Sequence, residues 1–245
     1  MQKPLYTLFS LLFLFTFFSC NHLIRHQEGN GNIISQNIKV DEFDEIDVGG
    51  NYEVLLISGK DENVELETDE NLMDFIEIYT HNHRLVIHSL ESLHSDHGIK
   101  VYVTYRNLSN INSSGASKVK TDGVLRSDDI DINMSGAGLL ELDLDCKALD
   151  MDISGAGLVR LSGVTNRQHL QFSGAGKLDA FNLRSRECYL DLSGVGAAEV
   201  YVTDLLDASV SGIGGIKYRG NPQKVNQNVS GLGKVTRDGK YDDNI

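Results

Sequence analysis

A four-residue motif, Ser-Gly followed by a variable residue and then usually by a second Gly, recurs seven times in the C-terminal half of the chain. The motifs begin at Ser114, Ser135, Ser154, Ser173, Ser193, Ser211 and Ser230. A regular spacing of about 19 residues is typical of stacked repeats in which every repeat forms one coil. This repeat restricts the fold to a solenoid more strongly than any other feature of the sequence.

The residues around each motif alternate between apolar and polar. An apolar residue precedes the serine in six of the motifs, namely Met134, Ile153, Phe172, Leu192, Val210 and Val229. Another apolar residue stands five positions after each serine, at Val119, Leu140, Val159, Leu178, Ala198, Ile216 and Val235. Alternation with period two indicates half-buried strands. We therefore predict an all-β parallel solenoid of about seven coils over residues 111–240.

We interpret the motifs as structural corners. The corner residues of the central coils are Ser135, Gly136, Gly138, Ser154, Gly155, Gly157, Ser173, Gly174, Gly176, Ser193, Gly194 and Gly196. Glycine fits a backbone that needs a positive φ or leaves no room for a Cβ atom. We expect the residue between the glycines to fill the inside of the corner. No base accompanies the serines and no helix follows the glycines, which argues against nucleophiles and against phosphate loops.

Residues 36–110 are predicted to be a β-rich N-terminal part that continues or caps the first coil. Six segments alternate or carry β-branched and aromatic residues: 43–48, 52–57, 64–68, 75–79, 85–88 and 99–105. A short helical turn is expected at 70–75. A cap is needed because an open solenoid end exposes a strand edge.

The first 20 residues have the pattern of a bacterial lipoprotein signal. Lys3 precedes an apolar run that ends at Ser19-Cys20, and Cys20 is the expected lipidation site. The alternative is an ordinary secretory signal cleaved near Ser19. Residues 21–35 are predicted to be a flexible tether. The membrane, reached through the lipid anchor, is thus an expected partner, and the expected location is the outer membrane, on its periplasmic or cell-surface side.

At the opening strands and the serial corners, the chain resembles a known family. The segments Phe43-Asp-Glu-Ile-Asp-Val48 and Tyr52-Glu-Val-Leu-Leu-Ile57, followed by Gly59, together with the Ser-Gly-Ala-Gly turns, are similar to GIN domains. These are adhesin-type head domains of unestablished function, found in lipoproteins of Bacteroidetes-type bacteria. The resemblance covers about residues 36–240. It implies a right-handed β-helix, an extracytoplasmic setting and no catalytic residues.

The net charge of the chain excludes some classes of ligand. The formal net charge of −13 disfavours nucleic acid and anionic lipid head groups as ligands.

The two internal cysteines are not expected to form a disulfide. Cys146 and Cys188 occupy different coil positions two coils apart, which is beyond disulfide reach, so we expect buried free thiols.

Two clusters are weak candidates for a metal site. His81 and His83 lie among five histidines between residues 81 and 97, but a hairpin turn explains them without a metal. Asp131, Asp150 and Asp152 could offer oxygen ligands to Ca²⁺, although alternating Asp is also typical of a solvated strand face. We predict no resident metal and no cofactor.

Two functions remain open from the sequence. The first is a non-catalytic envelope lipoprotein that acts as a binding, adhesion or scaffold module for an envelope protein or a glycan. The alternative is a polysaccharide-binding or polysaccharide-degrading β-helix protein. The absence of Trp and of a singular acid–base constellation argues against an enzyme. The oligomeric state is left open.

Overall fold

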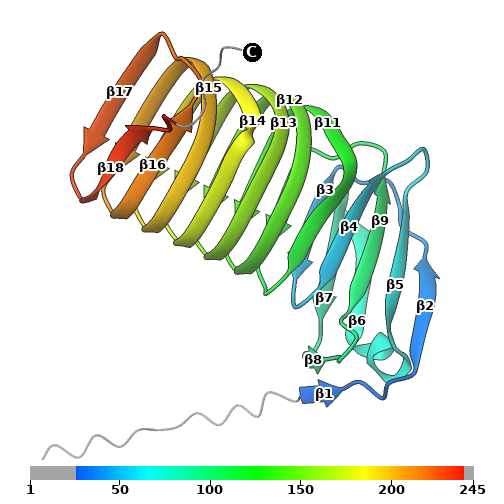
Figure 1. Cartoon of the computed structure of the whole chain (residues 1–245). Coiled ribbons are helices and arrows are strands. Elements are labelled where there is room, and N and C mark those ends of the chain that lie inside the picture. Colours follow the sequence, from blue (N-terminus) through cyan, green and yellow to red (C-terminus); the bar gives the residue numbers. More distant parts are fainter. Residues whose placement is uncertain (1–25, 240–245) are drawn as a thin grey trace, which may run out of the picture.

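A computed structural model describes residues 26–239 as a stack of strands along one axis (Figure 1). The strands are β1 (His26–Glu28), β2 (Ile33–Ile38), β3 (Glu45–Gly49), β4 (Glu53–Ser58), β5 (Asn63–Asp69), β6 (Ile76–His81), β7 (Arg84–Ser89), β8 (Ser92–His94), β9 (Lys100–Tyr105), β10 (Asn110–Ser113), β11 (Lys118–Met134), β12 (Ala137–Ile153), β13 (Ala156–Phe172), β14 (Ala175–Leu192), β15 (Val195–Val210), β16 (Ile213–Arg219), β17 (Lys224–Val229) and β18 (Leu232–Arg237). A 3-10 helix, η1, spans Glu70–Phe75. The predicted all-β parallel solenoid is confirmed.

Each central coil consists of one long curved strand and one sharp corner. Strands β12 and β13 pair in parallel from Ala137 with Ala156 through to Ile153 with Phe172. The break between them falls at Ser154-Gly155, so the repeated motif forms the corner. The coil from Ser114 to Ser135 is 21 residues long and accommodates its extra residues by a register shift between Lys120 and Val124.

The core lies inside the coils, where the sequence places it. The residues directly before the serines, from Met134 to Val210, are buried, and so are those five positions after them, from Val119 to Ile216. The last coil differs, because Val229 is 43% exposed and Val235 is only partly buried. No further coil covers these two side chains within the described part of the chain.

The expectation that the variable corner residue points inward is wrong. Val195, Ile213 and Leu232 are 57%, 55% and 79% exposed, and the alanines at the same position in earlier coils are exposed as well. The backbone bends at the first glycine of the motif, and the residue that follows it points away from the coil. The residues before and after the corner already fill its inside.

The parallel ladders extend upstream of the first repeated corner. Strand β3 pairs with β10 and β7 with β3 on one side, and β4 pairs with β11 and β9 with β4 on the other, all in parallel. All six strand segments predicted between residues 43 and 105 form strands, and the expected helical turn at 70–75 is η1. Residues 45–105 thus add coils that lack the repeated motif.

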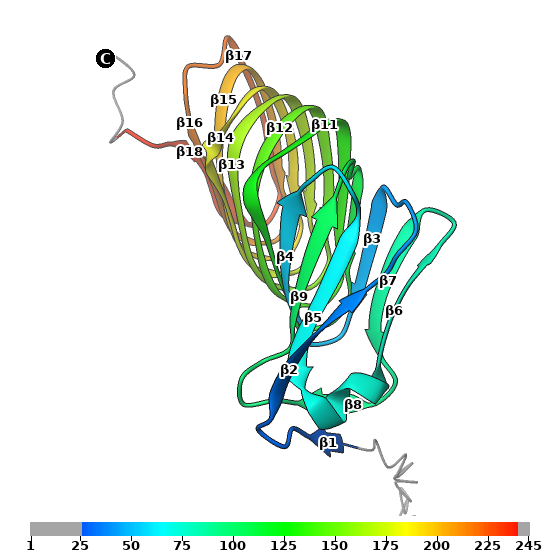
Figure 2. The same ribbon diagram turned by 90° about the vertical axis from the view of Figure 1, so that its right-hand side faces the viewer.

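At the N-terminal end the chain reverses direction. Strand β5 is antiparallel to β9, β2 is antiparallel to β5, and β6 is antiparallel to β7. Figure 2 shows these strands at the near end of the stack, with η1 below them. Leu72 of η1 is fully buried, so this helix covers part of the core at the N-terminal end of the stack.

Part of the segment assigned to a flexible tether is ordered. Residues 26–28 form β1, which pairs in parallel with β8, and β2 begins at Ile33. Asp69 fixes the loop between these strands, because its carboxylate accepts a hydrogen bond of 2.6 Å from the Gly31 amide. The signal segment 1–20, Cys20 and residues 21–25 lie outside the described residues. Within residues 26–239 no helix is long and apolar enough to span a membrane.

Candidate binding surfaces

The corners stack so closely that backbone meets backbone. A Cβ atom on Gly155 would lie 1.7 Å from the carbonyl oxygen of Gly136, and one on Gly157 would lie 2.2 Å from that of Gly138. The amide of Ala156 donates a hydrogen bond of 3.0 Å to the Gly136 carbonyl oxygen. Lack of room therefore accounts for both glycines, and the amides of Ser154 and Ala156 donate to the neighbouring coil rather than to an anion.

The exposed apex residues form a continuous ridge, which we call the corner ridge. Strand register aligns its members from coil to coil: Ala116, Ala137, Ala156, Ala175, Val195, Ile213 and Leu232. The serines of the motifs are exposed beside it. Contiguous exposed apolar surface is a common feature of interaction sites, so the corner ridge is a candidate binding surface. The drift from Ala to Leu was visible in the sequence, but strand parity could not tell which way the apex points.

A polar row runs beside the corner ridge, two residues before each serine. Its members are Asn112, Asn133, Asp152, Gln171, Asp191, Ser209 and Asn228, aligned by the parallel pairing of neighbouring strands. The Asn133 amide donates a hydrogen bond of 3.1 Å to the Asn112 side-chain oxygen. Amide and carboxylate groups are therefore presented at coil spacing along one face.

The acidic candidates fall on this face without converging on a cation site. Asp131 lies beside Asp150 on the next strand, whereas Asp152 belongs to the neighbouring row. Partial burial and the nearby carboxylates of Asp150 and Asp129 raise the pKa of Asp131. Asp150 in turn contacts His169, with 3.2 Å between Oδ1 and Nδ1. Among residues 26–239, no group of three or more His, Cys, Asp or Glu side chains is arranged to hold a metal ion.

The histidine candidates lie in a hairpin turn. His81 ends β6, and Asn82 and His83 adopt φ angles of 49° and 60° before β7 begins. The carbonyl oxygen of His83 accepts backbone hydrogen bonds from Asp44 and Glu45. Such turns tolerate Asn in the left-handed region, so the geometry explains these residues without a metal.

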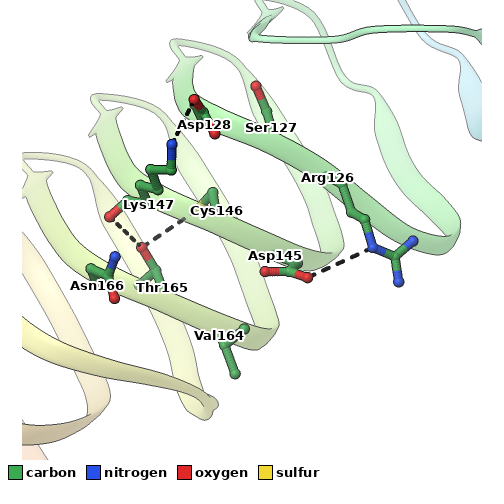
Figure 3. Close-up of a pocket in the computed structure, with 9 residues that line it drawn as sticks. All are labelled: Arg126, Ser127, Asp128, Asp145, Cys146, Lys147, Val164, Thr165 and Asn166. Carbon is green, nitrogen blue, oxygen red and sulfur yellow. Dashed lines mark hydrogen bonds and ion pairs between the residues drawn. The ribbon is translucent and has the colours of Figure 1, made fainter.

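A shallow hollow of about 440 Å³ lies over the middle of strands β11, β12 and β13 (Figure 3). Its lining residues are Arg126, Ser127, Asp128, Asp145, Cys146, Lys147, Val164, Thr165 and Asn166. Lys147 donates to Asp128 over 2.8 Å, and Arg126 lies 3.7 Å from Asp145. These charges neutralise one another across adjacent coils. The hollow therefore presents no acid–base pair of the kind that hydrolysis requires.

Both internal cysteines are buried free thiols. Cys146 pairs in register with Thr165, whereas Cys188 pairs with Gln168, so the two thiols belong to different rows. Burial raises the pKa of both thiols. A thiol held in its protonated form is a poor nucleophile, which fits a packing role.

The fold and these surfaces define a parallel β-solenoid that offers long exposed rows. The chain belongs to the family described as "Putative auto-transporter adhesin, head GIN domain", whose model matches residues 42–222. The resemblance to GIN domains that the opening strands and the corners indicated is therefore confirmed.

Solved structures share this fold. A "putative adhesin" from Bacteroides fragilis NCTC 9343 is 25% identical, with a TM-score of 0.83, and the alignment covers 86% of this chain and all of that one. A "putative lipid binding protein" from Parabacteroides distasonis ATCC 8503 is 22% identical, with a TM-score of 0.71 and coverage of 87% and 100%. A "putative adhesin" from Parabacteroides merdae ATCC 43184 is 22% identical, with a TM-score of 0.67 and coverage of 87% and 99%. None of the curated proteins matches the sequence.

Proposed function

We propose that this protein is a non-catalytic adhesion module of the bacterial envelope, and that the side of the solenoid carrying the corner ridge is its binding surface. The observation that carries this proposal is the in-register row of exposed apolar residues from Ala116 to Leu232. A row that repeats with every coil, about 4.8 Å apart, suits a partner with its own repeat. Membership of an adhesin-type family supports a binding role.

The neighbouring polar row indicates what kind of partner fits best. Asn133, Asp152 and Gln171 offer amide and carboxylate groups beside the small apolar ridge. A glycan chain presents hydroxyl groups for such side chains and ring C–H groups for the ridge. An extended glycan of the envelope or of a neighbouring cell is therefore the proposed ligand class, and an extended protein chain is the alternative.

Glycan-array binding of the full chain tests this function. Arg substitutions at Ala156 and Ala175 place long charged side chains on the middle of the corner ridge and are expected to abolish binding. Val164→Arg is the matched control, because Val164 is 49% exposed but lies in the hollow of Figure 3. Binding that is equal in all three variants would contradict the proposal. Release of unsaturated or hydrolysed sugars would establish the polysaccharide-degrading alternative instead.

We also propose that Cys20 carries a lipid anchor in the outer membrane. Palmitate labelling of the full chain is expected, and Cys20→Ala should abolish it. Labelling that persists in the variant would contradict the anchor. Protease treatment of intact cells then separates the periplasmic side from the cell-surface side, since only a surface-exposed chain is degraded.

A further inference from the structure

The two ends of the stack both expose strand edges. Within residues 26–239, strands β2 and β6 each have one partner at the N-terminal end, and β17 and β18 each have one partner at the C-terminal end. Figure 1 places β2 and β6 at one extremity of the molecule and β17 and β18 at the other. Unpaired strand edges are templates on which another strand can pair.

The C-terminal end is cationic in an otherwise acidic protein. Residues 208–239 contain five Lys or Arg and a single Asp. Arg219 pairs with Asp238 at 2.9 Å. The other four cations, Lys217, Lys224, Lys234 and Arg237, have no ion-pair partner among the described residues. By contrast, most cations of the central coils are neutralised across coils, as in Lys120 with Glu141 and Lys177 with Glu199.

The N-terminal end has the opposite charge. Residues 61–81, which include β5, η1 and β6, contain eight Asp or Glu and no Lys or Arg. Glu67 and Glu62 are paired with Lys100 and Arg106, which leaves six acidic residues without a Lys or Arg partner among the described ion pairs. Asp74 and Glu70 are exposed there. Both ends also expose apolar side chains on their edge strands: Ile34 (37%) and Tyr79 (45%) at one end, Val229 (43%) and Leu232 (79%) at the other.

We infer that copies of this chain associate head to tail, with β2 and β6 of one copy against β18 and β17 of the next. The charge signs select this arrangement, because two C-terminal ends or two N-terminal ends would face each other with like charge. Strand directions permit it as well. Along the ladders β2 runs parallel to β18 and β6 antiparallel to β17, and both kinds of pairing form regular ladders. Head-to-tail contacts of this type propagate into a filament.

Lysines on edge strands often serve the opposite purpose and keep copies apart. Repulsion of this kind requires the facing end to be neutral or basic. Strand β2 itself carries no charged residue, but η1 and β6 beside it expose Glu70, Asp74 and Glu77, so the end that a second copy offers is acidic. At physiological ionic strength the Debye length is about 8 Å, so the excess negative charge elsewhere on each copy is largely screened and the contacting ends dominate. This association goes beyond the proposed glycan-binding function, and neither depends on the other.

Cross-linking in cells that express the full chain tests the inference. The double variant Tyr79→Cys with Gln227→Cys places one thiol on β6 and one on β17, and Ile34→Cys with Leu232→Cys does the same for β2 and β18. After treatment with a flexible bis-maleimide, we expect at least one double variant to give a ladder of dimers, trimers and larger species. Each of the four single variants is expected to remain monomeric. Cys146 and Cys188 are buried and do not compete for the reagent.

Charge-reversal variants test whether the opposite charges of the two ends drive the association. The pair Lys224→Glu and Lys234→Glu should lower the cross-linked fraction about tenfold. The matched control, Arg167→Glu with Arg184→Glu, reverses two exposed charges on the central coils and should leave the ladder unchanged. Adding Asp74→Lys and Glu77→Lys to the Lys224→Glu, Lys234→Glu variant should restore the cross-linked fraction, because opposite charges then face each other again. Thermal melting of each variant verifies that the solenoid is intact.

Three results would overturn head-to-tail association. The first is the absence of a ladder from both double variants. The second is a dimer formed by a single-cysteine variant, which would indicate a symmetric contact between like ends. The third is cross-linking of the C-terminal cysteine to a different protein without a ladder, which would assign that end to another partner.

Discussion

The repeated coils and the N-terminal coils build the same parallel ladders under different constraints. At a repeated corner, a Cβ atom on Gly155 would meet the Gly136 carbonyl oxygen at 1.7 Å. In the upstream coil Gly50 takes the place of the motif glycine, and a Cβ atom there would lie 2.4 Å from the ring of Tyr52 rather than against a carbonyl oxygen. Gly49 stands where the repeats have a serine, and its Cβ would come no closer than 3.3 Å to the Ser114 hydroxyl oxygen. Backbone therefore packs on backbone at the repeated corners, whereas the upstream corner packs on a side chain.

The largest effect should come from adding one methyl group at a repeated corner. Gly155→Ala forces Cβ into a backbone carbonyl that cannot move independently of its own coil, so we expect the free energy of unfolding to fall by about 3 kcal/mol or more. Gly49→Ala lies at the position that the repeats fill with serine and meets no backbone atom, so it should cost less than about 1 kcal/mol. Denaturant unfolding of the two variants measures the difference. Equal losses would contradict the backbone contact proposed to make glycine necessary at the repeated corner.

A core truncation compares the centre of the stack with its open end. Phe172 is 1% exposed, and Phe172→Ala should lower the free energy of unfolding by about 3–5 kcal/mol. Val235 is only partly buried in the last coil, so Val235→Ala should cost about 1 kcal/mol or less. If both variants lost the same stability in denaturant titrations, the last coil would be as tightly packed as the middle, contrary to the exposure of Val229.

Thiol labelling follows local opening of the central coils. Cys188 is fully buried and Cys146 is 7% exposed, and burial raises the pKa of each thiol, so little thiolate is present near pH 8. We expect both to react at least about tenfold more slowly than a free thiol. Cys146, which borders the hollow, should react before Cys188 in a mass-spectrometric time course. Faster labelling of Cys188 would show that the coils do not open from the hollow.

The smallest effect concerns the acidic face. The pKa of Asp131 is raised in the folded protein, so its ionised form is disfavoured by folding and lowers stability above its pKa. Asp131→Asn should therefore raise the free energy of unfolding at pH 7 by less than about 0.5 kcal/mol, because the site is exposed and screened, and denaturant titration measures this gain. The gain should vanish near pH 3, where Asp131 is protonated. Asp152→Asn, flanked by neutral Asn133 and Gln171, is the matched control.

The sequence was sufficient for the parts of the fold that depend on alternation and period. The buried residues before and after each serine, the coil number and the strands between residues 43 and 105 follow from local patterns that packing does not override. The short strands β1 and β8 and the start of β2 were missed, because pairing partners distant in sequence hold them. His26, for example, pairs with Ser92. Residues 36–110 were predicted to continue or cap the first coil, but the strands that pair in parallel upstream of Ser114 could not be assigned to particular coils, because they carry no repeated motif.

Surface features were harder to predict than the core. The apex residues were assigned to the interior because they are apolar, but their direction is set by the bend at the preceding glycine rather than by alternation. The opposite charges of the two ends were present in the composition, yet only the stacking order places residues 61–81 and 208–239 at opposite extremities.

The central coils are equivalent to one another, so the number of coils can change without altering the two ends of the molecule. Strands β12, β13 and β14 each follow a Ser-Gly-Ala-Gly corner and present the same backbone to both neighbours. A duplicated coil of 19 residues would meet on either side the corner geometry it already fits, and would lengthen the molecule by about 4.8 Å. Reach from one end to the other can thus be adjusted in fixed increments by gene duplication, while the surfaces at the two ends stay unchanged.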